Sequence, residues 1–211
     1  MRPRASGKHQ YLKSVGKSGL VSRFSRVIIE RRLPFRRRTQ GWESDGKQAW
    51  DEHFGKLNAV NMGFGGDRTQ HVLWRLDNGN IDGIKPKAAV LMIGTNNSNG
   101  NDNTAEEIGE GISAIVKKLR EKLPETKILV LAIFPRGAKP DAQREKNAQA
   151  SAIAAKLADD KRVCFMDIGP KFLDPDGTLT PLMMPELLHL NANSYSIWAR
   201  EIDAKVRELM K

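Results

Sequence analysis

The sequence predicts an α/β domain in which a parallel β-sheet carries helices on both faces. From residue 47 onward, apolar runs alternate with segments of helical periodicity, which is typical of parallel strands joined by crossover helices. The run over residues 88–93 contains no charge, as expected for a strand buried on both faces. It ends in the turn residues Gly94, Thr95, Asn96 and Asn97, at the kind of strand end where open α/β sheets bind ligands.

The remaining elements follow from periodicity and from capping residues. Helices are predicted over residues 47–57, 70–76, 104–123, 141–159 and 193–210, and strands over residues 59–62, 127–133 and 162–168. Thr104 is a typical N-cap, and Glu106 and Glu107 match the positive end of the helix dipole behind it. Asp67 or Thr69 is expected to cap the helix over residues 70–76. The stretch of residues 169–190 is irregular, and long loops in compact domains are usually functional or mobile.

Composition limits the class of protein. The chain has 211 residues, enough for one α/β domain with a sizeable core. Its single cysteine, Cys164, lies in an apolar run and is expected to be a small buried side chain, which excludes a disulfide framework and a zinc cluster. No apolar run approaches the length of a membrane span, and the N-terminus lacks the apolar region of a secretory signal. A cytoplasmic location is therefore the default expectation.

The basic charge is concentrated at one end of the chain. Residues 1–40 hold 12 Lys and Arg and one acid, which gives +11, whereas the remaining 171 residues hold 23 bases and 24 acids, which gives −1. We therefore divide the chain into a basic segment of residues 1–38, expected to be irregular, and a nearly neutral domain of residues 39–211. The segment could contact nucleic acid or an anionic membrane, could be an organelle transit peptide, or could be a solvated tail.

A glycine-rich turn follows the predicted strand over residues 59–62. Residues 63–66 contain three glycines, which let the backbone turn sharply and approach a ligand with its N–H groups. The spacing lacks the third glycine of a dinucleotide-binding motif, and no Gly-Lys-Ser/Thr follows as in a P-loop. The helix start behind this turn is suited to an oxyanion. At the next strand end, Asn96 could donate its amide to a substrate oxygen, or Asn96 and Asn97 could merely form an Asx-turn.

Glu186 and His189 have the spacing of an acid that supports a histidine base. A carboxylate three residues before a histidine can accept a hydrogen bond from Nδ1–H, which fixes the tautomer and leaves Nε2 as a general base. A structural pair is also compatible with this short motif. His71 is expected to pack or to cap a helix, and neither His9 nor His53 is taken as a catalytic candidate.

Taken in order, these motifs resemble the SGNH (GDSL-type) hydrolases. Within that family they are most similar to the group that includes the catalytic subunits of platelet-activating-factor acetylhydrolase Ib and their bacterial relatives. The resemblance covers roughly residue 39 to the C-terminus. It rests on residues 61–76, 84–87, 94–97, 134–137 and 189–191, which read NMGFGGDRTQHVLWRL, IKPK, GTNN, FPRG and HLN.

The resemblance implies a flavodoxin-like three-layer αβα sandwich with a parallel five-stranded sheet, and a serine esterase mechanism. It implies that the Gly66 N–H and the Asn96 side chain bind the oxyanion and that His189 is the general base. Glu186 stands where the family usually has Asp. It also implies a small acyl-ester substrate that carries an acetyl group, a homodimer as in related enzymes, and neither a metal nor an organic cofactor.

One motif of the family is missing. The family has Gly-Asp-Ser after its first strand, shortly before a segment such as the Thr-Gln-Gly-Trp-Glu that is present here. Phe35, Arg36 and Arg37 occupy those three positions, so Arg37 stands where the nucleophilic serine is expected. Neither Thr39 nor Ser44 is expected to replace it, because a nucleophile must reach the histidine base by a hydrogen bond.

The excess charge and the loss of resemblance coincide, because both lie before residue 39. We therefore hypothesise that residues from about 20 to 38 come from a shifted reading frame or a misassigned start. Codons for residues 32–37, read from their second base, can spell Val-Phe-Leu-Phe-Gly-Asp. Resequencing the gene tests this hypothesis.

Three functions follow from these observations. The first is an esterase that removes a short acyl group from a lipid or a sugar. The second is a catalytically inactive relative that binds esters or a partner protein, which the literal sequence favours. The third is a nucleic-acid-binding protein that uses the basic segment, and the lack of interleaved aromatic residues or a known reader motif argues against it.

Overall fold

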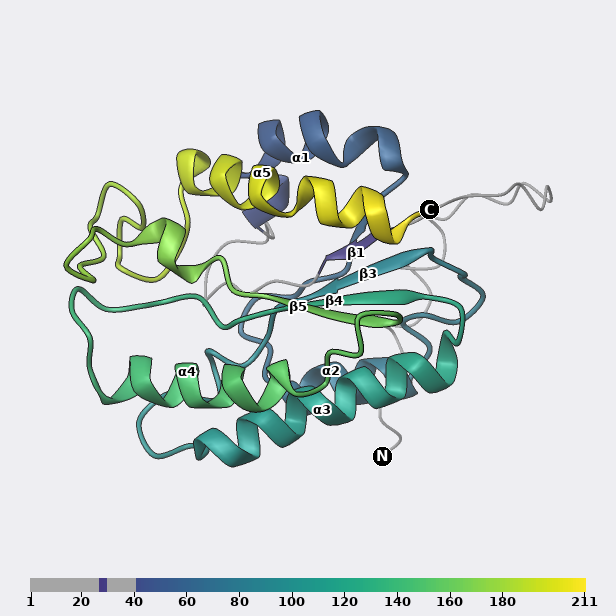
Figure 1. Cartoon of the computed structure of the whole chain (residues 1–211), viewed down its shortest axis with the longest axis horizontal. Helices are drawn as coiled ribbons and strands as arrows, with labels where there is room; N and C mark the ends of the chain where they lie inside the picture. Colours follow the sequence, from purple (N-terminus) through teal and green to yellow (C-terminus); the bar gives the residue numbers. More distant parts are fainter. Residues whose placement is uncertain (1–26, 30–40) are drawn as a thin grey trace, which may run out of the picture.

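A sheet of parallel strands forms the middle layer of the protein (Figure 1). The structure is a computed structural model that describes residues 27–29 and 41–211. The strands are β1 (Val27–Ile29), β2 (Val60–Asn61), β3 (Ala88–Leu91), β4 (Lys127–Leu131) and β5 (Val163–Met166), in the order β2-β1-β3-β4-β5. All neighbouring pairs are parallel. The chain therefore reverses its direction of winding between β1 and β3, which is where ligands bind in open sheets of this type.

Strand β1 lies inside the segment that the sequence analysis placed before the domain. Its register pairs Ile28 with Val60 of β2 on one side and with Ala89 of β3 on the other. Part of the sheet therefore comes from residues 1–38. The other residues of that segment, including Arg37 at the expected nucleophile position, lie outside the described residues.

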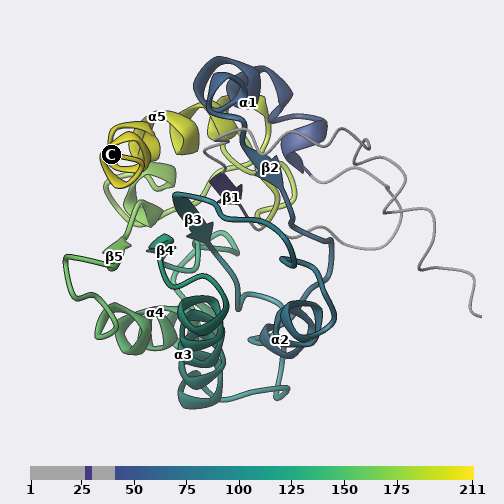
Figure 2. The ribbon, with the colours of Figure 1, turned by 90° about the vertical axis from the view of Figure 1, so that its right-hand side faces the viewer.

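Helices cover both faces of the sheet, which confirms the predicted α/β class (Figures 1 and 2). On one face lie α1 (Lys47–His53) and α5 (Ala192–Leu209), and on the other lie α2 (Thr69–Asp77), α3 (Ala105–Lys122) and α4 (Ala142–Ala155). Each face has its own cluster of buried apolar side chains. Strand β3 supplies both clusters, because its side chains alternate between the two faces and all four are buried.

An aromatic cluster joins the start of the continuously described chain to α5. Trp42, in the short helix η2 (Gly41–Glu43), is 1% exposed, and its ring centroid lies 4.6 Å from that of Tyr195 and 4.9 Å from that of Trp198. Trp50 and Phe54 complete the cluster from the side of α1. Aromatic pairs at these separations are stabilising beyond the area that they bury. The cluster therefore fixes η2 and α1 against α5.

His53 finds an acidic partner on another helix of the same layer. His53, at the end of α1, lies with its Nδ1 3.3 Å from Oδ1 of Asp203 in α5. The hydrogen bond from the Arg207 guanidinium lowers the pKa of Asp203. Burial opposes this effect and His53 adds to it, so the pKa lies below its usual value. The pair therefore belongs to the packing of α1 on α5.

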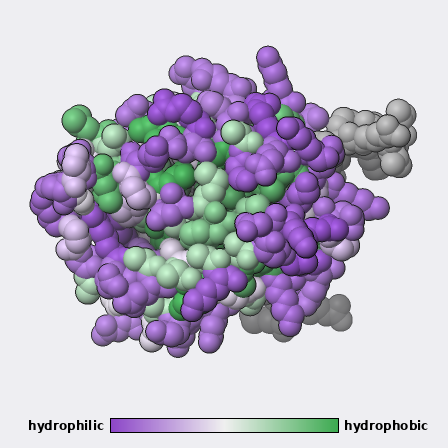
Figure 3. Space-filling view, in the orientation of Figure 1, coloured by the Kyte–Doolittle hydropathy of each residue, from purple (hydrophilic) through white to green (hydrophobic). Residues whose placement is uncertain are grey.

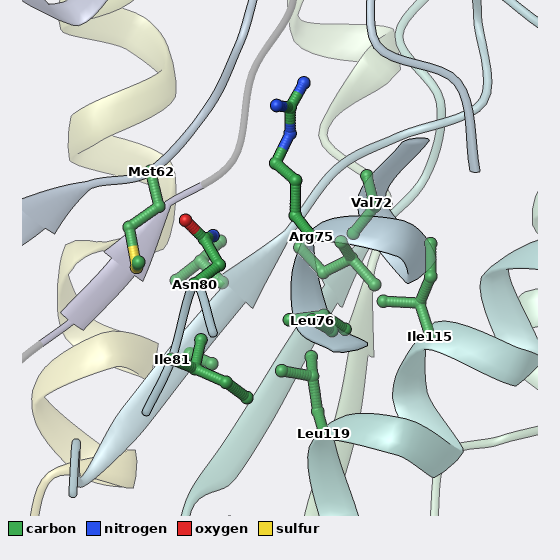
Figure 4. A pocket seen from close by; sticks show the side chains of 11 residues that line it. Met62, Val72, Arg75, Leu76, Asn80, Ile81, Ile115 and Leu119 are labelled. Carbon is green, nitrogen blue, oxygen red and sulfur yellow. The ribbon is translucent and has the colours of Figure 1, made fainter. Parts of the chain in front are cut away.

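On the other face, a small cavity of about 30 Å³ lies between α2, α3 and the sheet (Figure 4). Its wall is mostly apolar, with Val72, Leu76, Ile115 and Leu119 among the lining residues. Figure 4 shows the guanidinium of Arg75 pointing away from this apolar group. A space of this size holds about one water molecule, so the cavity is a packing defect rather than a ligand site.

The N-cap of α3 is confirmed. The Thr104 side chain accepts a hydrogen bond from the Glu107 N–H at 3.2 Å, and the Glu107 side chain accepts one from the Thr104 N–H at 3.0 Å. This reciprocal pair satisfies two N–H groups that a helix start leaves without intrahelical partners.

The predicted cap of α2 is wrong. The N-cap is Arg68, whose N–H donates to Nδ1 of His71 at 3.2 Å. Thr69 already belongs to the first turn of the helix, and Asp67 binds an arginine instead, as described below. The expectation that His71 packs or caps is confirmed, because it serves as a cap.

Several elements are shorter than the sequence predicts. The helix expected over residues 47–57 stops at His53, and a separate short helix, η3 (Gly55–Leu57), leads to Asn58 in the left-handed region at φ +53°. The strand expected over residues 88–93 ends at Leu91, which is also where its register with β4 ends. The apolar run in the sequence is longer than the hydrogen-bonded strand, because residues of the following buried segment, such as Met92 and Ile93, are apolar too.

The surface shown in Figure 3 has a polar rim and apolar residues gathered across its middle, over the region where β5 and α4 lie in Figure 1. A hollow of about 350 Å³ is lined there by residues of β5, α4 and the short helix η4 (Gly169–Phe172). In the described parts of the chain, no helix has the length and apolar character required to cross a membrane.

Candidate active site

The predicted site residues lie on loops that leave the carboxyl ends of the strands. The loop after β2 carries Gly66, the loop after β3 carries Asn96, and the loop between β5 and α5 carries Glu186 and His189. Because the strands are parallel, the first residues of these loops leave the sheet at the same edge.

Asn96 connects the loop after β3 to the glycine-rich turn. Its side-chain Nδ2 donates a hydrogen bond of 2.8 Å to the main-chain carbonyl of Asp67, the residue directly after Gly66. Asn96 is 7% exposed, and Gly66 is exposed at φ +80°. An amide nitrogen carries two N–H groups, so the bond to Asp67 uses one of them. Gly66 and Asn96, 30 residues apart in sequence, are thus brought together.

Asn97 performs a different task from its neighbour. Its Oδ1 accepts a hydrogen bond from the Thr69 N–H at 3.0 Å, and its Nδ2 donates to Thr69 Oγ1, Gln70 Oε1 and Asn103 Oδ1 at 3.1 to 3.2 Å. Asn97 is 2% exposed and satisfies the first N–H of α2. Asn96 bonds to the residue two positions before α2 and Asn97 to the first turn of α2, so a purely local Asx-turn does not describe them.

An ion pair between the buried Asp67 and the partly buried Arg75 fixes the glycine-rich turn from behind. Asp67 is 3% exposed, and its carboxylate accepts hydrogen bonds from Nε of Arg75, at 3.0 Å, and from Nη2 of the same guanidinium. The guanidinium also lies over the ring of Phe64, 3.9 Å from its centroid. A cation on an aromatic face adds stability when both are removed from water. Local sequence patterns do not reveal this role of Asp67, because its partner Arg75 lies eight residues away in the chain.

Glu186 and His189 form the predicted pair. The imidazole Nδ1 lies 2.5 Å from Oε2 of Glu186, so Nδ1–H donates to the carboxylate. The His189 side chain is 14% exposed and that of Glu186 is 72% exposed. The imidazole is therefore mostly buried, while its acidic partner faces water.

The backbone between these two residues is held in a strained conformation. Leu187 has φ +55°, which is uncommon for a residue with a branched side chain. Two main-chain hydrogen bonds maintain it: the Leu187 N–H donates to Met184 O at 2.7 Å, and the Gly137 N–H donates to Leu187 O at 2.8 Å. The second bond ties the histidine loop to the loop after β4.

The start of α5 holds the other side of the histidine loop. The Oδ1 of Asn191 accepts a hydrogen bond from the Ser194 N–H at 3.1 Å, and its Nδ2 donates to Leu182 O at 2.7 Å. His189 is thus placed two residues before a capped helix. Asn191 belongs to the motif that carried the resemblance, and its capping role explains why an asparagine suits this position.

The geometry provides two pairs at one edge of an α/β sheet: a glycine turn with an amide donor, and a carboxylate with a buried imidazole. Hydrolases of the α/β class combine such donors with a histidine base. In the described residues, no cluster of three or more His, Cys, Asp or Glu side chains has an arrangement that could hold a metal ion.

Comparison with known proteins identifies the family. The model of the GDSL-like lipase/acylhydrolase family matches residues 38–197, and the chain belongs to this family. Human platelet-activating factor acetylhydrolase IB subunit alpha1 is 41% identical over 164 residues, which are 77% of this chain and 70% of that protein. The match to the family model begins after Arg37, where the sequence resemblance also begins.

Solved structures share the fold at low sequence identity. A putative platelet activating factor from Streptococcus pneumoniae superposes with a TM-score of 0.68 at 22% identity, covering 90% of this chain and 86% of that one. Est24, a carbohydrate acetylesterase from Sinorhizobium meliloti, gives a TM-score of 0.66 at 19% identity and covers 89% and 100% of the two chains. These likenesses confirm the SGNH-type α/β fold that the sequence motifs implied.

Proposed function

We propose that the protein is an ester hydrolase that removes an acetyl group from a lipid or carbohydrate ester. The observation that carries this proposal is the hydrogen bond from Asn96 to the carbonyl of Asp67, which brings an amide donor next to the Gly66 turn. Membership of an acylhydrolase family supports the reaction class, and the names of the acetylhydrolase and acetylesterase relatives support the acetyl group.

In the proposed mechanism, a serine hydroxyl attacks the ester carbonyl while His189 takes its proton through Nε2. The Gly66 N–H and the Asn96 side chain stabilise the negative charge that develops on the carbonyl oxygen. His189 then gives the proton to the leaving alcohol, and water releases the acyl group from the serine in the same way. Glu186 holds the imidazole in the required tautomer, because its carboxylate accepts the Nδ1–H.

The proposed mechanism requires a serine nucleophile, and Arg37 occupies the position of that serine. The described chain that follows this position packs against α5. Trp42, five residues after Arg37, packs on Tyr195, six residues after His189. A chain with this site but no serine retains only the rate that oxyanion donors and binding supply, on the order of 10³–10⁴ over water.

Hydrolysis of p-nitrophenyl acetate tests the proposal in two proteins, the chain as it stands and a restored-serine variant carrying Phe35→Gly, Arg36→Asp and Arg37→Ser. We expect the restored-serine variant to hydrolyse the ester with a burst of acyl-enzyme and the unchanged chain to be slower by about 10²-fold or more. Asn96→Ala in the restored-serine variant should remove most of the gain. A folded restored-serine variant without activity contradicts the site assignment.

A second function, an inactive relative that binds esters, is favoured by Arg37 alone. Resequencing the gene separates the two. A fresh sequence that encodes Gly-Asp-Ser before Thr39 supports the esterase, whereas one that encodes the three consecutive arginines favours the binding protein. We further propose a cytoplasmic location and a homodimer, both of which follow from the family resemblance and the default expectation rather than from a contact in this chain.

A further inference from the structure

We propose that Arg136 is a positioning residue that couples the Asn96 turn to the His189 loop. This inference rests on the proposed function, because it assigns Arg136 a role in arranging the two halves of that site. Arg136 lies in the loop after β4, between the loop after β3 and the loop that carries His189.

The side chain of Arg136 spans the turn that carries Asn96. Its Nη1 donates to the carbonyl oxygen of Thr95 at 3.2 Å and to Oδ1 of Asn99 at 2.9 Å. Thr95 directly precedes Asn96, and Asn99 lies at the far end of the same turn. The guanidinium therefore fixes both ends of the segment that presents the amide donor.

The main chain of the same loop contacts the histidine side. The Gly137 N–H donates to Leu187 O at 2.8 Å, two residues before His189. Arg144 of α4 holds this segment in place, because its Nε donates to Arg136 O at 2.8 Å and its Nη2 donates to Gly137 O at 2.5 Å. The Arg136 side chain therefore contacts the Asn96 turn, and the main-chain N–H of the next residue, Gly137, contacts the His189 loop.

Among the residues that the structure describes, no carboxylate forms an ion pair with Arg136. Within residues 41–211, its hydrogen-bond acceptors are neutral oxygens of Thr95 and Asn99. Burial lowers the pKa of the half-buried guanidinium, and the more distant Asp141 acts in the opposite direction. A neutral side chain could hold the same oxygens at a lower desolvation cost. The positive charge of Arg136 would stabilise the negative charge that develops on the substrate oxygen at this edge of the sheet during the reaction.

Three variants test the inference in both the unchanged chain and the restored-serine variant. Arg136→Met removes the hydrogen bonds and the charge, and Arg136→Lys keeps the charge with one donor group in place of a fork. Lys139→Met is the matched control. It removes a positive charge from the same loop, but Lys139 contacts Asp176 and Thr178 rather than the Asn96 turn.

The first measurement is amide hydrogen exchange, which needs no catalytic activity. The N–H groups of Asn97 and Ser98 both donate to Gly94 O inside the turn. We expect Arg136→Met to speed their exchange by about tenfold and to speed exchange around Leu187 as well, because local opening becomes easier. Lys139→Met should leave both regions unchanged. Unchanged exchange in Arg136→Met would overturn the coupling.

The second measurement is the split between kcat and KM in whichever protein hydrolyses p-nitrophenyl acetate. Misplacement of a donor acts on the transition state, so we expect Arg136→Met to lower kcat by about tenfold with KM changed less than twofold, and Arg136→Lys to recover part of the loss. A raised KM with unchanged kcat would overturn the positioning role and indicate a substrate contact. If Arg136→Met does not fold, the kcat of Arg136→Lys tests the inference instead. A kcat equal to that of the parent protein would contradict the positioning role.

The two proposals fail in distinguishable ways. If neither protein hydrolyses esters, the proposed function fails while the exchange measurement still tests the coupling of the two loops. If hydrolysis is present but Arg136→Met matches Lys139→Met in exchange and in kcat, the proposed function stands and the role of Arg136 fails.

Discussion

The side-chain amide of Asn96 and the main-chain carbonyl of Asp67 are joined by a hydrogen bond of 2.8 Å. This bond connects the loops that follow β2 and β3, two strands that do not pair with each other but both flank β1. It therefore spans the point where the winding of the sheet reverses. A change on either side of this bond is expected to disturb the other.

Asn96 and Asn97 should separate activity from stability. In the restored-serine variant, Asn96→Ala should lower kcat for p-nitrophenyl acetate by about 10²–10³-fold, as for loss of one oxyanion donor. Asn97→Ala should instead lower the free energy of unfolding by about 2–3 kcal/mol, because it leaves the buried Thr69 N–H without its acceptor. Kinetics and chemical denaturation of both variants check this, and equal effects of the two substitutions on kcat would contradict the assignment.

The Asp67–Arg75 pair should show strong coupling. Arg75→Met leaves a buried carboxylate without its partner and should cost about 3 kcal/mol of unfolding free energy. Asp67→Asn in the same protein should recover a large part of that loss, because the uncompensated charge is then gone. A double-mutant cycle by urea denaturation measures the coupling, and additive losses would show that the two residues act independently.

Glu186 should contribute less than a buried triad acid. Its carboxylate is 72% exposed, so water can partly replace it in holding the imidazole. We expect Glu186→Gln in the restored-serine variant to lower kcat by about 10–100-fold, well below the loss of about 10⁴ seen when a buried acid is replaced. The effect should weaken at high salt. Glu125→Gln, at an exposed carboxylate far from this loop in sequence, is the control.

Because of Asp159, the free energy of unfolding should depend on pH in the acid range. The N–H groups of Val163 and Arg162 lower the pKa of Asp159 to about 2, with Lys161 and Arg120 adding to the effect. Because the folded pKa is below the unfolded value of about 3.9, the stabilisation is complete above about pH 4 and is lost as the pH falls towards 2.

Asp159→Asn tests this dependence. At pH 7 we expect a loss of about 1 kcal/mol, less than the pKa shift alone implies, because the side chain is more than one third exposed to water. The difference from the unchanged chain should shrink between pH 4 and pH 2, as measured by denaturation at each pH. Asp160→Asn is the control, because it alters the neighbouring charge and leaves the acceptor of these N–H groups in place.

The sequence predicted the fold class and family well, because those depend on repeating patterns. Buried strands, helix faces and the Thr104 cap each follow from residues close together in the chain. Element ends were predicted less well. The helix from residue 47 stops at His53, and the register of β3 with β4, which no local pattern contains, decides where β3 ends.

The contacts made by the predicted site residues could not be predicted from the sequence. Asn96 and Asn97 are adjacent and chemically identical, and only the long-range contacts with Asp67 and Thr69 distinguish them. The role of Asp67 was likewise hidden, because its arginine partner lies two helical turns away. The catalytic roles of Gly66, Asn96, Glu186 and His189 stay predictions until the variants above are measured.

Intrinsic tryptophan fluorescence should report on the aromatic cluster around Trp42. Three of the four tryptophans, Trp42, Trp50 and Trp198, pack together between η2, α1 and α5, whereas Trp74 is 63% exposed. Detachment of η2 from α5 would transfer indole rings from an apolar to an aqueous surrounding and shift their emission to longer wavelength. In a Trp74→Phe background, the docking of the chain just behind residue 37 could then be followed in unlabelled protein, in real time.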